Sequence, residues 1–224
     1  DPESPLDLLR RDSVRESLVD EAAAPGPDPD RLAGPFAHIV VDEAQELTDA
    51  QWQMLLRRCP SRSFTIVGDR AQARRGFVGD WPERLHDLGF TEVATASLTV
   101  NYRTPAEVMD AAEPVIREVF PDANVPVSIR RSRIPVRYGR VDQLDAILAD
   151  WLAAHEGIAC VIGKPASVAS DRIQAHTPES VKGLEFDLVV LVDLDAFGDG
   201  VPGAVDRYVA MTGAVMLGLG LLLA

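Results

Sequence analysis

Two adjacent carboxylates, Asp42 and Glu43, follow the first strongly apolar stretch of the chain, residues 38–41. That stretch predicts a strand, and ligands of parallel sheets bind beyond the carboxyl ends of the strands. Asp42 is suited to hold Mg²⁺ directly or through water, because this ion takes one or two carboxylates together with phosphate oxygens. Glu43 is suited to polarise a water that attacks a γ-phosphate. Acidic turn residues that only end a strand would explain the same pair.

A second apolar stretch ends in the same way. Residues 64–67 (FTIV) predict a strand, and Gly68 and Asp69 come directly after it. Gln72 lies three residues beyond Asp69, where its side-chain amide can sense a γ-phosphate. Two strand ends of this kind strengthen the interpretation that phosphate is bound at one edge of the sheet.

Three more segments carry residues suited to phosphate chemistry. Arg103 lies in the stretch NYRT at 101–104, just before a helix that begins with a proline. An arginine at this position can stabilise charge on a transferring phosphoryl group. The other two segments are KGLEFD at 182–187, which leads into the apolar run LVVLVD, and YVAMTGA at 208–214.

The order of these segments resembles a known family. VDEAQ, GDRAQ, NYRT, KGLEFD and YVAMT are similar to motifs II to VI of the superfamily 1 helicases of the UvrD/Rep/PcrA type, over residues 36 to about 218. Residues 42–69 resemble most closely the HelD group, which associates with RNA polymerase. The resemblance implies a RecA-like P-loop NTPase fold, ATP and Mg²⁺ as ligands, and single-stranded DNA or RNA polymerase as the partner.

The resemblance also implies catalytic roles for four residues. Asp42 and Glu43 match the family's Mg²⁺-binding and water-activating pair. Gln72 matches the glutamine that couples the nucleotide to single-stranded nucleic acid. Arg103 matches the motif IV arginine that contacts the γ-phosphate.

Four further residues match positions that bind the nucleotide or lie beside it. Glu185 matches the glutamate that binds the nucleotide ribose. Lys182 and Gly183 fall in the segment that links the nucleotide to the nucleic-acid strand, and Tyr102 sits where the family packs an aromatic near the base.

The chain departs from the family in its phosphate-binding loop. That loop has the pattern Gly-x-x-x-x-Gly-Lys-Ser/Thr, in which backbone N–H groups and one lysine hold the β- and γ-phosphates. The chain has only two lysines, and Lys182 belongs to KGLEFD. Lys164 is followed by Pro165, which lacks the required N–H, so Gly163 and Lys164 predict a turn after the strand 159–162 instead.

The last motif is also altered. The family has an arginine where this chain has Gly213, and the histidine of motif V is replaced by Glu179. Because one arginine finger contributes several powers of ten in rate, ATP hydrolysis by this chain alone is not expected.

Two functions remain open. The first is a C-terminal portion of an ATP-dependent superfamily 1 helicase or translocase, which would need a missing N-terminal helicase lobe. The second is a catalytically dead RecA-like binding module that docks on RNA polymerase or another protein. The glycine at position 213 favours the second, because truncation alone would not change that residue.

From Phe36 onward, short apolar runs alternate with helical patterns, which predicts a parallel sheet covered by helices on both faces. We expect an N-terminal surface helix over 1–23, a linker to residue 35, the C-terminal part of a first RecA-like lobe over 36–97 and a second lobe over 98–224. Strands are predicted at 38–41, 64–67, 125–129, 159–162, 188–193 and, as a buried terminal strand, 214–224. Helices are predicted at 49–58, 81–88, 105–120 and 141–155, with Trp52, Trp81 and Trp151 in the core.

The composition fits a globular protein of one large or two small domains. The chain has 224 residues, a net charge of −13 and 46% hydrophobic residues. Two separated cysteines and no apolar leader favour a cytoplasmic protein, and the eleven-residue apolar run at 214–224 is too short to span a bilayer.

The net charge excludes a generally basic nucleic-acid coat. The arginines are nevertheless concentrated at 57–75 and 130–140. These two segments are either solvated surface or local contacts with nucleic-acid phosphates or an acidic partner.

Overall fold

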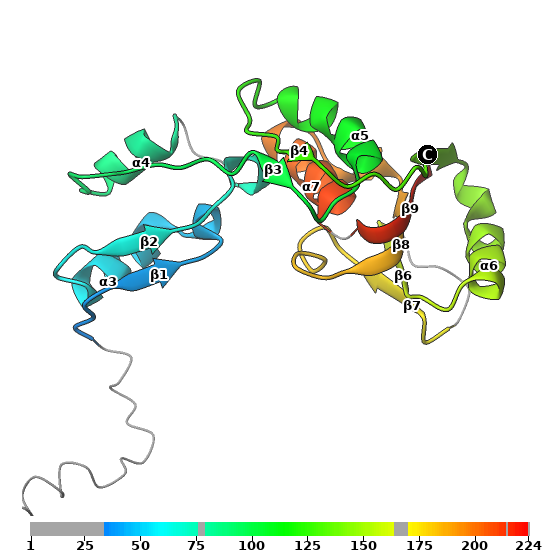
Figure 1. Ribbon diagram of the computed structural model, residues 1–224, viewed down its shortest axis with the longest axis horizontal. Helices are drawn as coiled ribbons and strands as arrows, with labels where there is room; N and C mark the ends of the chain where they lie inside the picture. The colour runs from blue at the N-terminus through cyan, green and yellow to red at the C-terminus, as the bar shows by residue number, and fades with distance from the viewer. Residues whose placement is uncertain (1–33, 76–78, 164–169, 214, 224) are drawn as a thin grey trace, which may run out of the picture.

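The computed structural model describes residues 34–75, 79–163, 170–213 and 215–223, the last range by its backbone (Figure 1). The helix expected over 1–23 and the proposed turn residue Lys164 lie outside the described residues. The described chain forms an N-terminal part, residues 34–97, and a C-terminal part, residues 98–223, which lie side by side (Figure 1).

The N-terminal part is built on two parallel strands, β1 (Ile39–Val41) and β2 (Phe64–Ile66), joined by helix α3 (Asp49–Arg58). Helix α3 is capped by Thr48, whose hydroxyl accepts a hydrogen bond from the Gln51 N–H while the Gln51 side chain accepts one from the Thr48 N–H. This capping box satisfies two otherwise unpaired donors of the first turn. The sequence contains the matching Thr-x-x-Gln, so the helix boundary is set locally.

The core of the N-terminal part is aromatic. Trp52, on α3, is 1% exposed and meets the ring of Phe90 edge-on at 6.2 Å, and Phe64 meets the same ring at 5.3 Å. Helix α4 (Trp81–Asp87) covers this cluster with Leu85, and Trp81 packs against it while partly exposed. The predicted core position of Trp52 is therefore confirmed.

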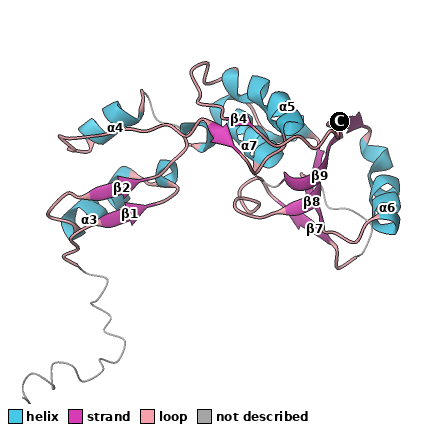
Figure 2. Ribbon diagram, viewed as in Figure 1, coloured by secondary structure: helices cyan, strands magenta, loops and turns pink. Residues whose placement is uncertain are grey.

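The C-terminal part contains a five-stranded parallel sheet in the order β5-β9-β8-β6-β7 (Figure 2). Its strands are β5 (Arg137–Gly139), β6 (Ala159–Ile162), β7 (Ile173–His176), β8 (Phe186–Val192) and β9 (Val215–Leu223). A separate parallel pair, β3 (Val100–Asn101) and β4 (Val127–Ser128), lies beside it.

Helices cover both faces of the larger sheet. Helices α5 (Ala106–Arg117) and α7 (Gly200–Thr212) pack on the face that carries Cys160, Ile162, Val189 and Leu191. Helix α6 (Leu144–Ala154) packs on the other face, which carries Ala159, Val161, Leu188, Val190 and Val192. Successive strand residues therefore point to opposite cores, which explains why these strands are apolar throughout rather than alternating.

The prediction of a parallel sheet covered on both faces is confirmed for the C-terminal part, and Trp151 is buried on α6 as expected. The described strands, however, form three separate sheets rather than one. Strands β3, β5 and β7 and helix α7 were not predicted. Helix α7 contains Gly200, Pro202 and Gly203 in its first turns, which are poor helix formers, and it is held instead by burial of its apolar residues.

The expected terminal strand is confirmed over residues 215–223 as β9, which lies between β5 and β8 and pairs with both. Four 3₁₀ turns complete the described structure: η2 (Ala44–Glu46), η3 (Arg70–Gln72), η4 (Val141–Gln143) and η5 (Leu194–Phe197). None of the helices in the described residues has the length and apolarity to cross a membrane.

Truncation of Leu148 tests the role of α6. Leu148 is fully buried between α6 and the sheet, so Leu148→Ala is expected to lower the free energy of unfolding by about 2–5 kcal/mol. Denaturant unfolding followed by circular dichroism measures this change. Asp150→Ala, at an exposed position of the same helix, is the control and should change stability by less than about 0.5 kcal/mol.

Candidate functional site

The carboxyl ends of β1 and β2 lie side by side and carry most of the acidic residues of interest. Asp42 and Glu43 follow β1 and are exposed, and the Asp42 carboxylate accepts a hydrogen bond from the Glu43 N–H at 2.9 Å. Glu43 has a left-handed backbone (φ 51°), which turns the chain sharply away from the strand.

Gln45 ties the two strand ends together. Its side-chain N–H₂ donates to the Glu43 carboxylate at 2.5 Å, and its side-chain oxygen accepts from the Asp69 N–H at 3.0 Å. Gln45 is 7% exposed, and both hydrogen bonds are partly buried. Gln45 belongs to the VDEAQ segment, in which sequence reasoning assigned only Asp42 and Glu43 to the site.

Gly68 is required by the close approach of its neighbours. A Cβ at this position would lie 2.6 Å from the Trp81 ring and 2.9 Å from the Gln45 side-chain oxygen. A side chain would therefore displace the residue that joins the two strand ends.

Asp69 organises the turn that carries Gln72. Its carboxylate accepts from the Ala71 N–H at 2.8 Å and from the Gln72 side-chain amide at 2.9 Å. Burial raises the pKa of Asp69 above its ordinary value, the Gln72 and Ala71 hydrogen bonds oppose this, Glu43 raises it further and Lys182 lowers it. Gln72 is thus held by Asp69, a residue that sequence reasoning had not placed in the site.

A second group of predicted residues lies in the C-terminal part. The Arg103 guanidinium forms an ion pair with Glu185 at 3.4 Å and donates to the Leu184 carbonyl at 3.2 Å. The Asn101 side chain accepts from the N–H groups of Arg103 and Thr104 at 2.8 and 2.9 Å. The structure therefore brings together Arg103 and Glu185, which are 82 positions apart in the chain.

The end of α7 lies against the same loop. The Thr104 hydroxyl donates to the Thr212 carbonyl at 3.2 Å, so position 213 is close to the NYRT segment. A Cβ at Gly213 would lie 2.8 Å from the Val209 carbonyl oxygen. An arginine at this position would thus require the end of the helix to shift.

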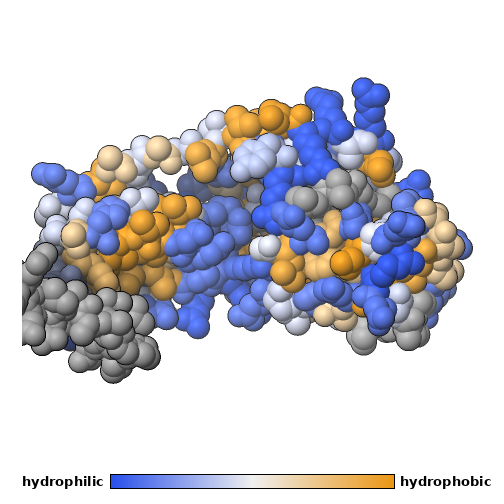
Figure 3. Space-filling model, turned by 60° about the horizontal axis from the view of Figure 1, so that its bottom comes forward, coloured by the Kyte–Doolittle hydropathy of each residue, from blue (hydrophilic) through white to orange (hydrophobic). Residues whose placement is uncertain are grey.

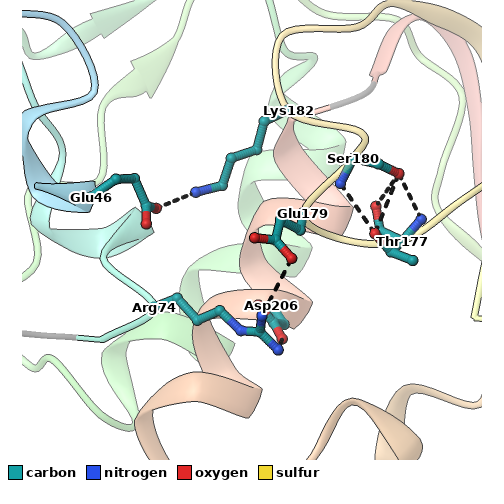
Figure 4. A network of polar contacts seen from close by, with 7 residues as sticks. All are labelled: Glu46, Arg74, Thr177, Glu179, Ser180, Lys182 and Asp206. Carbon is teal, nitrogen blue, oxygen red and sulfur yellow. Dashed lines mark hydrogen bonds and ion pairs between the residues drawn. The ribbon is translucent and has the colours of Figure 1, made fainter.

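Lys182 connects the two groups. Its ammonium lies 2.5 Å from the Glu46 carboxylate of the N-terminal part (Figure 4). The loop that carries Lys182 is fixed by reciprocal hydrogen bonds between Thr177 and Ser180 (Figure 4). Gly183 follows with a left-handed backbone (φ 78°) and open space around it, whereas Tyr102 is 79% exposed.

The structure thus gathers the predicted residues into two sets. Asp42, Glu43 and Gln72 lie at the ends of β1 and β2, and Arg103 and Glu185 lie in the C-terminal part, with Lys182 between them. Within the described residues no group of three or more His, Cys, Asp or Glu side chains is arranged to hold a metal ion. A cavity of about 470 Å³ lies elsewhere, between β2, α4 and residues 92–97.

The arginine-rich segments are used partly inside the molecule. Arg70 pairs with Asp122 at 2.8 Å, and Arg74 pairs with Asp206 at 3.1 Å. In the second segment Arg130 donates to the Arg103 carbonyl at 2.9 Å. Other members of both segments are exposed: Arg57, Arg75, Arg131, Arg133 and Arg137. Each segment therefore contains arginines that bind other residues of the chain and arginines that are exposed to solvent.

The raised pKa of Asp69 predicts how the effect of its replacement on stability depends on pH. Because its folded-state pKa is raised, the folded protein gains stability relative to the unfolded chain as pH falls toward the ordinary aspartate value of about 3.9. Asp69→Asn keeps the cap. The free energy of unfolding of this variant minus that of the wild type should therefore be larger at pH 7 than at pH 4.5. Urea unfolding at the two pH values measures this difference.

Asp122→Asn provides a contrast of opposite sign. The Arg70 hydrogen bond lowers the pKa of Asp122, so the stability contributed by this carboxylate is present at neutral pH and is lost on acidification. An Asp69→Asn variant that behaved like Asp122→Asn would contradict the assignment of Asp69 as a carboxylate destabilised by burial.

Comparisons with known proteins agree with the fold. No protein-family model matches the chain, and a search of curated proteins finds no match. Among solved structures, the chain is similar to arterivirus nonstructural protein 10, a helicase, with a TM-score of 0.50 and 19% identity over 93% of this chain. A structure of the PRRSV helicase aligns over 88% of this chain and 40% of its own, with 18% identity and a TM-score of 0.46.

The chain spans about half of the arterivirus helicase, 49% of its length. At this level of identity, the likeness bears on the fold alone. The fold of this chain is therefore similar to that of part of a viral helicase.

Proposed function

We propose that this chain is the motif II to VI region of an ATP-dependent superfamily 1 helicase or translocase of the UvrD/HelD type. In this proposal residues 36–97 belong to a first RecA-like lobe and residues 98–224 form a second. The observation that carries it is the convergence of distant motif segments: Arg103 pairs with Glu185, and Lys182 reaches Glu46 beside the ends of β1 and β2. The likeness to part of an arterivirus helicase supports the same interpretation.

The acidic side of the proposed site has the donors that Mg²⁺ prefers. Asp42 would hold the ion, with its remaining positions filled by water and phosphate oxygens. Glu43 would orient and deprotonate a water, and its hydrogen bond from Gln45 fixes the carboxylate for that task. ATP would supply the phosphoryl group for transfer, with Glu185 at its ribose and Gln72 and Arg103 at its phosphates.

The proposed site has few free groups that could bind the phosphates of ATP. In this structure Arg103 is paired with Glu185, and Lys182 is paired with Glu46, so each cation is neutralised by a carboxylate of the same chain. The sequence offers no Gly-x-x-x-x-Gly-Lys-Ser/Thr loop and has Gly213 in place of an arginine. We therefore infer that this chain binds ATP weakly and does not hydrolyse it unless other residues complete the phosphate site.

The same pairing favours the alternative function, a RecA-like binding module without catalysis. In that case the motif residues hold the molecule together, and a face of it docks on RNA polymerase or another protein. Single-stranded DNA is the partner expected for the motor. The exposed arginines of residues 130–140 are the proposed contact for its phosphates.

Hydrolysis by the isolated chain tests the incomplete site. We expect no Mg²⁺-dependent phosphate release from ATP above background, because the sequence has no phosphate-binding loop and Arg103 is already paired with Glu185. Phosphate release is measured with and without Mg²⁺, and titration calorimetry should show weak binding at most. A rate that disappears in Glu43→Gln would prove the inference of an incomplete site wrong.

Salt dependence tests the nucleic-acid contact. Arg131 and Arg137 are exposed, so removal of both in Arg131→Ala/Arg137→Ala should weaken single-stranded DNA binding. The slope of log K against log salt should become shallower by about 1.4, at about 0.7 per phosphate contact on single strands. Fluorescence anisotropy over a range of salt concentrations measures the slope.

Arg140→Ala is the matched control for this experiment. Arg140 lies in the same segment but is paired with Asp142 at 2.9 Å, so its loss should change the slope less. DNA binding that is unchanged by Arg131→Ala/Arg137→Ala would exclude this segment as the contact.

A further inference from the structure

The two parts of the molecule are connected by a segment without helix or strand. Residues 91–99 lie between α4 and β3, belong to no helix or strand, and are exposed at every position. Among the strands that the structure describes, none pairs with a strand of the other part. The relative placement of the parts must therefore depend on contacts between side chains.

Those contacts centre on η3, the 3₁₀ turn that follows β2. Ala71 is 2% exposed and belongs to the hydrophobic core that α7 forms with the larger sheet. A small apolar side chain from the N-terminal part thus packs into the core of the C-terminal part. It buries little area, so it supplies limited stabilisation by itself.

Arg70 and Arg74 flank Ala71 and both meet acidic residues of the C-terminal part. The Arg70 guanidinium lies 4.8 Å above the Phe120 ring and 2.8 Å from the Asp122 carboxylate. Its Nε atom is buried without a hydrogen-bond partner among the described residues. The desolvation of this cation is therefore only partly compensated.

Arg74 lies between two carboxylates (Figure 4). It is 3.1 Å from Asp206 of α7 and 3.6 Å from Glu179. The Asp206 side chain is only 11% exposed, and an unpaired carboxylate in such a place is costly. Burial raises the pKa of Asp206, while Arg74 and Lys182 lower it.

Lys182 forms a third ion pair between the two parts. Here the cation belongs to the C-terminal part, and its partner Glu46 belongs to the N-terminal part. The face drawn in Figure 3 shows hydrophilic side chains gathered between two more apolar regions. The polar contacts between the parts in the described residues are thus ion pairs, and exposed ion pairs are individually weak and screened by salt.

We propose that Arg70, Arg74 and Lys182, with their partners Asp122, Asp206, Glu179 and Glu46, form an ionic clamp that, together with the packing of Ala71, sets the relative placement of the two parts. The clamp opens when its charges are screened or removed, and each part stays folded because its core is built mainly from its own residues. Residues 70–74 are then a docking segment for an acidic face of the same chain. This inference requires no nucleotide and does not depend on the proposed function.

A distance measurement across the clamp tests the proposal in the full chain. Spin labels are placed at Gln53→Cys on α3 and Asp150→Cys on α6, both exposed positions, and their separation is measured by pulsed electron spin resonance. The native Cys59 and Cys160 are fully buried and should remain unlabelled. At about 0.1 M salt we expect one narrow distance distribution, which broadens at about 1 M, where the Debye length falls from ~10 to ~3 Å.

Charge reversal tests the individual contacts. Arg74→Ala, Glu46→Lys and Lys182→Glu should each lose the narrow distribution at low salt, and the double variant Glu46→Lys/Lys182→Glu should restore it. Asp142→Lys is the control: it makes the same charge change as Glu46→Lys but breaks only the Arg140–Asp142 pair within the C-terminal part. It should leave the distribution unchanged.

Circular dichroism on every variant separates opening from unfolding. The clamp predicts a native helix signal together with a broadened distance distribution. If Arg74→Ala unfolds the protein, the exposed pair of Glu46 and Lys182 still decides the question. A narrow distribution that survives both charge reversals and high salt would overturn the proposal.

Discussion

The docking of η3 onto α7 is the contact on which the arrangement of the candidate site depends. Ala71 enters a core built by the C-terminal part, and Arg74 places its charge beside Asp206. Because the same turn carries Gln72 and begins at Asp69, this docking also determines where the ends of β1 and β2 face. The Lys182–Glu46 pair joins the same two parts of the molecule.

Charge pairing within the chain is the recurring physical theme of the site. Arg103 and Glu185 were expected to contact different ends of one nucleotide, and in this structure they contact each other. Both side chains are substantially exposed, so the pair contributes little to stability. A bound polyanion would have to compete with carboxylates already in place, which agrees with the weak nucleotide binding that we propose.

The local features of the fold were accessible from the sequence, because they depend on neighbouring residues. The Thr48 cap sets the start of α3, and the apolar run 188–192 forms a strand buried on both faces, as its composition predicts. The strand β7 and helix α7 were missed, because β7 contains polar, exposed residues and α7 begins with Gly-Val-Pro-Gly, which does not show the periodicity of a helix. Their burial and pairing depend on neighbours that are distant in the sequence.

By itself the sequence determined the order of the motif segments, the parallel character of the sheets and the absence of a phosphate-loop lysine among its two lysines. These follow from residue identity, spacing and local conformational preference. Only the tertiary structure decided that Gln45 joins the two strand ends, that Arg103 is engaged by Glu185 and that part of an arginine-rich segment docks internally. Such outcomes depend on distances between residues far apart in the chain, which no local pattern encodes.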